Sequence, residues 1–123
     1  MHEFSMTSQI IREVLKETEA REAKKVLEVH LVIGDLTLLG IEQIKSCYMM
    51  LVDGTVMEGS MLKIKRKKGK VICEKCRYKG PIQFLDDPVY HVSFPTLMCP
   101  RCGSPARIIE GKECLIKRIK MMV

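Results

Sequence analysis

Two pairs of closely spaced cysteines constrain this chain more than any other feature. Cys73 and Cys76 form one Cys-x-x-Cys pair, Cys99 and Cys102 form the other, and 22 residues separate the pairs. Each pair places two thiols on one tight turn, and two facing turns supply four sulfurs at the corners of a tetrahedron. Zn²⁺ imposes no geometry of its own and binds thiolates well. We therefore predict a four-cysteine zinc site, with disulfides or an iron–sulfur cluster as the alternatives.

A zinc ion with four thiolate ligands has no open coordination position, so this site is predicted to be structural rather than catalytic. The remaining cysteines, Cys47 and Cys114, lie in apolar surroundings and are predicted to be buried free thiols. Six cysteines in a chain without a secretory leader indicate a reducing compartment, and we expect a cytoplasmic protein. No apolar stretch approaches the length of a membrane span.

The net charge of +6 is unevenly distributed along the chain. Residues 1–60 carry 6 basic and 10 acidic side chains, whereas residues 61–70 alone carry 6 basic ones. The segment that holds the cysteine pairs is nearly neutral, although a zinc ribbon that binds nucleic acid is expected to be basic itself. We therefore expect no nucleic-acid partner. The alternative function is a zinc-ribbon nucleic-acid-binding protein that uses the basic run at residues 63–70.

Hydrophobic periodicity predicts an α+β fold, in which a small mixed sheet is packed by two helices and carries an inserted zinc-ribbon-like domain with four cysteine ligands. The expected helices span residues 5–22 and 41–52, and the expected strands span 26–33, 36–39, 61–66 with an extension through 71–72, 106–110 and 113–121. Residues 81–96 contain three prolines and are predicted to form a loop. The predicted domains are residues 1–70 plus 106–123, and residues 71–105.

The periodicity also assigns individual side chains to the core. In the first strand Leu27, Val29, Leu31 and Ile33 are expected to share the buried face, with Glu28 and His30 on the other. In the second helix an apolar stripe begins at Ile41, and the neighbouring methionines Met49 and Met50 are predicted to extend it into the core.

The chain begins Met1-His2-Glu3, which is a second candidate metal site. The imidazole of His2 can join the terminal amine of Met1 and the intervening His2 amide nitrogen in one chelate. An all-nitrogen chelate with a deprotonated amide favours a planar Ni²⁺ or Cu²⁺ ion over tetrahedral Zn²⁺. The alternatives are that His2 is simply solvated and that Glu3 is an acid favourable to the first turn of a helix.

Several stretches together resemble the HypA/HybF family of hydrogenase nickel-insertion accessory proteins. They are Met1-His2-Glu3 with Ser5 before an amphipathic helix, Val32-Ile33-Gly34-Asp35-Leu36, Gly54-Thr55, Glu58-Gly59, the two cysteine pairs and Gly111-Lys112-Glu113. The resemblance covers essentially the whole chain in order. Its most specific part is the initial Met-His-Glu combined with the late cysteine quartet.

The resemblance implies a nickel metallochaperone that delivers Ni(II) during maturation of the large subunit of a [NiFe]-hydrogenase. It implies that His2 holds nickel with the N-terminal amine and backbone amide, that Glu3 acts as a ligand or supports the site, and that Cys73, Cys76, Cys99 and Cys102 hold Zn(II). A HypB-type GTPase or a related ATPase is the implied partner. We expect no enzymatic activity, because no nucleophile–base arrangement is visible in the sequence.

The chain departs from the family pattern at three points. The long spacing between cysteine pairs is typical of archaeal-like members, Arg77 follows Cys76 where glycine is usual, and the last strand contains Cys114 and a basic end. Related long-loop members imply that His91 reaches the nickel and completes a planar set, with a hydrogen-bonding loop residue as the alternative. A third reading is a zinc-stabilised interaction module whose first residues have no chemical role.

Overall fold

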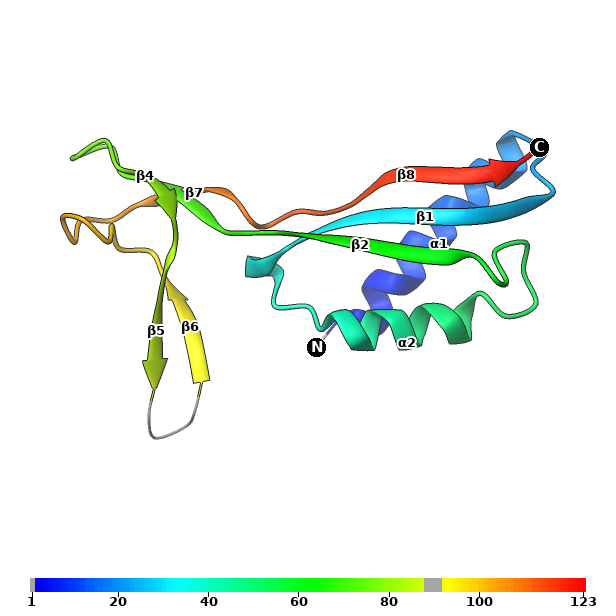
Figure 1. Cartoon of the computed structure of the whole chain (residues 1–123), viewed down its shortest axis with the longest axis horizontal. Coiled ribbons are helices and arrows are strands. Elements are labelled where there is room, and N and C mark those ends of the chain that lie inside the picture. The colour runs from blue at the N-terminus through cyan, green and yellow to red at the C-terminus, as the bar shows by residue number, and fades with distance from the viewer. Residues whose placement is uncertain (1, 88–91) are drawn as a thin grey trace. The chain divides into compact units, whose positions relative to one another are not determined.

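The computed structural model describes residues 2–87 and 92–123, with the backbone alone for 84–87 and 92–95. Its elements are α1 (Glu3–Ala20), β1 (Lys25–Gly34), a 3-10 turn η1 (Asp35–Thr37), α2 (Ile41–Leu51), β2 (Met61–Lys67), β3 (Lys70–Ile72), β4 (Lys79–Pro81), β5 (Gln83–Asp87), β6 (Val92–Thr96), β7 (Arg107–Glu110) and β8 (Cys114–Met122) (Figure 1). The chain divides into two compact units. The first comprises residues 1–33, 38–66 and 114–123, and the second comprises residues 34–37 and 67–113.

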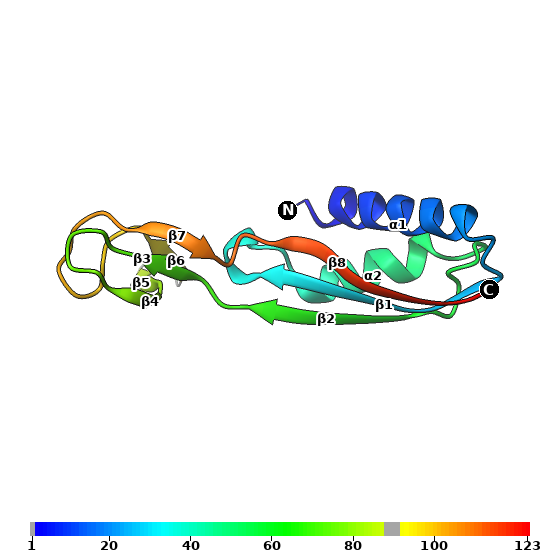
Figure 2. The same ribbon diagram turned by 90° about the horizontal axis from the view of Figure 1, so that it is seen from above.

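The first unit is a three-stranded sheet with two helices packed on it. The strand order is β2-β1-β8, and β8 is antiparallel to β1 while β1 and β2 run in the same direction, so the sheet is mixed (Figure 2). Both helices are amphipathic, and their apolar stripes meet the buried side of β1. The core contains Ile10, Ile11 and Val14 of α1, Val26, Val29, Leu31 and Ile33 of β1, Ile44 and Tyr48 of α2, and Val52 and Met57. The α+β prediction is confirmed.

A β-bulge changes which residues of β1 are buried. The pairing with β8 shifts between Val26 and Glu28, so Leu27 is the extra residue of the strand. Val26 is completely buried in place of Leu27, which is only half-buried. The expected face of Leu27, Val29, Leu31 and Ile33 is therefore wrong at its first member, because simple alternation does not anticipate a bulge.

The methionines of α2 do not enter the core. Met49 and Met50 are 74% and 68% exposed, which contradicts the prediction that they extend the buried stripe. The buried side of α2 is narrow and contains Ile44 and Tyr48, whose hydroxyl is hydrogen-bonded to Ser60 at 2.5 Å. Ile44 and Tyr48 make the contact between α2 and the core, and Met49 and Met50 lie on the solvent side of the helix.

The second unit contains a small three-stranded sheet, of order β4-β3-β7, and a β5–β6 hairpin. Strands β5 and β6 contradict the loop expected at residues 81–96, of which 88–91 lie outside the described residues, and their register pairs Phe84 with Pro95. A two-stranded ribbon leaves each strand one unpaired edge, so a proline without an N–H is tolerated there. The strand expected at residues 36–39 is also wrong, because η1 occupies this stretch and the Thr37 hydroxyl donates to the Gly34 carbonyl.

The division between units falls at residues 66/67 and 113/114, whereas residues 70 and 105 were the expected boundaries. The reason is that β3 and β7 pair with each other and belong to one sheet. The strand expected to run from 61 into 72 is interrupted before β3, so β2 and β3 belong to different sheets. Within the described parts of the chain, no helix is long and apolar enough to cross a membrane.

Candidate metal centre

The four paired cysteines lie together at one end of β3. Their sulfur atoms are all within 4.8 Å of one another, and the pairs Cys73–Cys102 and Cys76–Cys99 are separated by 3.6 and 3.5 Å. Four sulfurs around one Zn²⁺ at about 2.3 Å would be roughly 3.8 Å apart. A disulfide requires sulfurs about 2.05 Å apart, and all four cysteines are free. The donor set therefore fits a single thiophilic ion.

Two equivalent turns hold these sulfurs. The Cys73 N–H donates to the Tyr78 carbonyl at 2.8 Å, and the Cys99 N–H donates to the Ser104 carbonyl at 2.7 Å, so each turn is closed over the same number of residues. The residue after the second cysteine has a positive φ in both turns, 63° at Arg77 and 75° at Gly103. The left-handed conformation turns the backbone back around the sulfurs, which explains why glycine is suited to both positions.

Hydrogen bonding and burial give the thiols different acidities. Hydrogen bonds from the Ser104 backbone and side chain lower the pKa of Cys102 to about 6. Burial raises the pKa of Cys76 to about 12. In the metal-free protein, Cys102 therefore loses its proton at a lower pH than Cys76 does. Because a metal binds thiolates, loading the site releases protons and its metal affinity falls as the pH is lowered.

The left-handed conformation of Arg77 leads to a prediction on metal affinity. A non-glycine residue in this region costs about 1 kcal/mol, so Arg77→Gly should tighten zinc binding roughly fivefold. Gly103→Ala should weaken it by a similar factor, since no atom lies within 4 Å of the added Cβ and only the φ of +75° opposes it. Competition with a chromophoric chelator measures both. A weaker affinity in Arg77→Gly would show instead that the arginine side chain supports the site.

His2 and Glu3 lie at the beginning of α1. His2 is the N-cap residue, its carbonyl accepts the Met6 N–H at 2.9 Å, and its exposed imidazole makes no capping hydrogen bond. The Glu3 carboxylate accepts the N–H of Gly40, the N-cap of α2, at 3.0 Å. Glu3 therefore contacts the N-terminal ends of both helices, where a negative charge is favourable. The sequence did not reveal this contact, which joins residues 37 positions apart.

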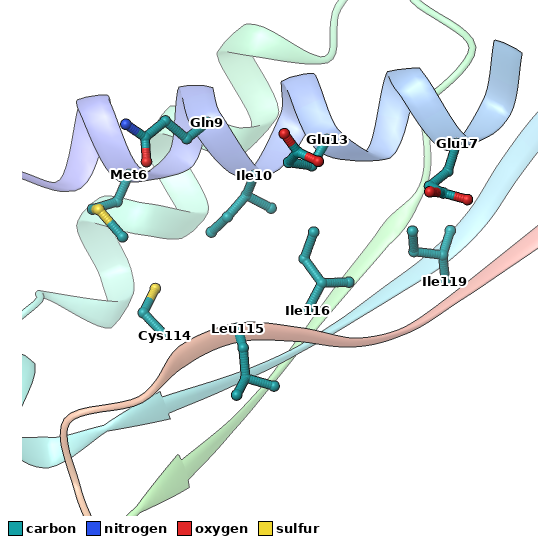
Figure 3. A pocket seen from close by; sticks show the side chains of 9 residues that line it. All are labelled: Met6, Gln9, Ile10, Glu13, Glu17, Cys114, Leu115, Ile116 and Ile119. Carbon is teal, nitrogen blue, oxygen red and sulfur yellow. The ribbon is translucent and has the colours of Figure 1, made fainter. Parts of the chain in front are cut away.

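Cys47 and Cys114 do not join the four-cysteine group. His91 and Met1 lie outside the described residues. Cys47 and Cys114 are free and half-buried rather than buried, and Cys114 points from β8 into a groove beside Met6 and Ile10 of α1 (Figure 3). Burial in that groove raises the pKa of the Cys114 thiol.

The basic run at residues 63–70 is partly neutralised within the protein. Lys63 pairs with Glu28 at 3.1 Å, Lys67 with Glu113 at 3.8 Å and Lys70 with Glu110 at 3.7 Å. These contacts reduce the charge that the run offers to a phosphate backbone and weaken the case for a nucleic-acid-binding ribbon.

A family model described as "Hydrogenase/urease nickel incorporation, metallochaperone, hypA" matches residues 1–121. The chain belongs to the HypA family. Among curated relatives, the hydrogenase maturation factor HypA of Methanothermobacter thermautotrophicus is 38% identical over 98% of this chain and 97% of its own length. The HypA of Methanopyrus kandleri is 34% identical over 100% of this chain and 94% of its own. The resemblance seen in the sequence is thus confirmed, and the family is one of nickel metallochaperones in hydrogenase maturation.

Two solved structures share the fold. One is the solution structure of the Ni metallochaperone HypA from Helicobacter pylori, with a TM-score of 0.65, 19% identity and coverage of 100% of this chain and 99% of that one. The other is a solution structure of a HypA protein, with a TM-score of 0.68, 22% identity and coverage of 99% and 97%. At this identity the two structures support the architecture of the HypA chain described above.

Proposed function

We propose that this HypA-family chain binds Ni(II) as cargo at its first residues and delivers it to the large subunit of a [NiFe]-hydrogenase. The proposed ligands are the Met1 amine, the His2 backbone amide and the His2 imidazole. Zn(II) is proposed to occupy the four-cysteine site, where it would hold the two turns together. A HypB-type GTPase or a related ATPase is the proposed partner, and His91 remains a proposed additional nickel ligand.

One observation carries the nickel proposal beyond family membership. Among the described residues, the four cysteines are the single group of three or more His, Cys, Asp or Glu side chains placed to hold a metal. Among the described side chains, none joins His2 in such a group, so nickel held there would take ligands from main-chain nitrogens, with His91 as the proposed additional side chain. Such a ligand set suits planar Ni²⁺, and its deprotonated amide predicts that nickel affinity falls as the pH is lowered.

The position of Glu3 favours a supporting role, in which its side chain holds the nickel ligands in place. Its carboxylate is hydrogen-bonded to Gly40 and ties the first turn of α1 to the start of α2. This contact would hold the backbone next to His2 in place while the chelate forms. Loss of a residue that supports a ligand in this way typically costs roughly 10–100-fold in metal affinity.

Calorimetric titration of the untagged, zinc-loaded protein with Ni²⁺ tests the proposal. His2→Ala and acetylation of the N-terminal amine should each weaken binding by more than about 100-fold, because each removes a ligand rather than a supporting contact. His30→Ala is the matched control, since His30 lies in β1 with its Nε2 3.2 Å from Glu28 and should leave nickel binding unchanged. Equal nickel binding by all four proteins would exclude the terminal chelate.

A further inference from the structure

The two sides of the first unit carry opposite charge. Helices α1 and α2 contain five acidic residues (Glu3, Glu13, Glu17, Glu19, Glu42) and three basic ones (Arg12, Lys16, Lys45). Within this unit, strands β1, β2 and β8 contain one acidic residue, Glu28, and seven basic ones (Lys25, Lys63, Lys65, Arg66, Lys117, Arg118, Lys120). Most of the positive charge of this unit therefore belongs to its sheet.

The register of the strands places much of this charge on the side of the sheet away from the helices. Ile116 and Ile119 of β8 pack on the core, and Leu115 points away from α1 (Figure 3). Across from β8, Glu28 pairs with Lys120, His30 with Arg118 and Lys25 with Met122. On β2, Leu62 and Ile64 pack on the core, so Lys63 and Lys65 alternate onto the outer side. We call this outer side the open sheet face.

The one carboxylate of the open sheet face is already neutralised. Glu28 contacts the His30 Nε2 at 3.2 Å and the Lys63 Nζ at 3.1 Å, and its side chain is 22% exposed. Hydrogen bonds from His30 and then from Lys63 lower its pKa, so it stays ionised and paired. Lys25, Lys65, Arg118 and Lys120 surround this pair as exposed cations. An approaching molecule meets a positive surface with apolar side chains in it.

We propose that the open sheet face is a docking surface for an acidic, partly apolar protein surface. Charge complementarity requires carboxylates opposite Lys65, Arg118 and Lys120. Leu115 and Met122, which are 46% and 50% exposed, offer apolar contacts between these cations. Exposed leucine and methionine suit a protein partner, and the three strands contain no Phe, Tyr or Trp side chain on which a nucleic-acid base would stack.

The docking surface deepens the proposed function, because a chaperone must contact the protein that it serves, but it uses none of the proposed nickel ligands. The docking proposal and the nickel-binding proposal can therefore be refuted independently of each other. Neutralising the open sheet face should leave the nickel titration unchanged, and His2→Ala should leave docking unchanged.

Three defined probes test the proposal against the zinc-loaded protein: an acidic peptide with leucine at every third position, a poly-glutamate peptide of equal charge, and a DNA duplex. We expect the leucine-containing peptide to bind most tightly and to weaken as salt is raised. Its amide shift changes should map to β1, β2 and β8. The combined variant Lys65→Gln, Arg118→Gln and Lys120→Gln should lose about tenfold in affinity, as expected for three exposed charge pairs.

The matched control neutralises the three basic residues of the helices, Arg12→Gln, Lys16→Gln and Lys45→Gln, and changes the net charge by the same amount. The control should bind the peptide like the unmodified chain. Equal losses in both variants, shift changes on the helices, or tighter binding of the duplex than of the peptide would each overturn the proposal.

Discussion

Removing the metal should unfold residues 67–113 while leaving the sheet-and-helix unit folded. Among the described residues, the second unit buries few hydrophobic side chains, namely Val71, Cys73, Ile82 and Cys99, and two of these are proposed ligands. The first unit has a continuous core of eleven buried residues. Metal binding in small zinc modules contributes on the order of 10–16 kcal/mol at pH 7, so the second unit depends on it for folding.

Amide hydrogen exchange before and after treatment with a strong chelator measures this effect. The amides of Cys73 and Cys99, which are hydrogen-bonded within the two turns, should lose protection, whereas those of β1 should keep it. Cys73→Ser should reproduce the chelated state in the presence of zinc. Cys47→Ser should not, because Cys47 lies in α2 of the first unit. Loss of protection in both units at one chelator concentration would contradict independent folding.

The features that local sequence determines were predictable. Each Cys-x-x-Cys pair forms its own turn, so four candidate metal ligands were identifiable without knowledge of the fold. The helices α1 and α2 begin and end within two residues of their expected bounds, because their apolar positions repeat with helical spacing. The β8 strand begins and ends within one residue of its expected bounds for the same kind of reason.

Features set by distant partners were not predictable. Three of the four residues at 36–39 are leucines, a pattern that suits a strand, but the Leu36 N–H donates to the Gly111 carbonyl, 75 positions away, and η1 forms over Asp35–Thr37 instead. The bulge at Leu27 depends on the register with β8. The contact between Glu3 and Gly40 requires α1 and α2 to be packed together. No short sequence pattern encodes these contacts between residues far apart in the chain.

Three backbone segments of the second unit meet at glycines, and this contact leads to the second large prediction. A Cβ on Gly34 would lie 2.0 Å from the Gly111 carbonyl oxygen, and a Cβ on Gly111 would lie 2.6 Å from the Gly69 Cα. That carbonyl oxygen accepts the Leu36 N–H at 2.9 Å, and the Gly34 N–H donates to the Glu113 carbonyl at 2.6 Å. An added Cβ would therefore clash with main-chain atoms of segments that are held in place by hydrogen bonds.

Gly34→Ala should lower the free energy of unfolding by about 3 kcal/mol, because the backbone must separate and the Leu36–Gly111 hydrogen bond is lost. Gly34 does not have a positive φ, so alanine meets no conformational strain there and the effect is steric. Gly103→Ala is the control in the same unit, with a positive φ and open space, and should cost about 1 kcal/mol. Denaturant unfolding of the zinc-loaded protein compares the two. If both variants lose the same stability and the Leu36 amide stays protected from exchange in Gly34→Ala, the close approach of the three segments is not a rigid part of the fold.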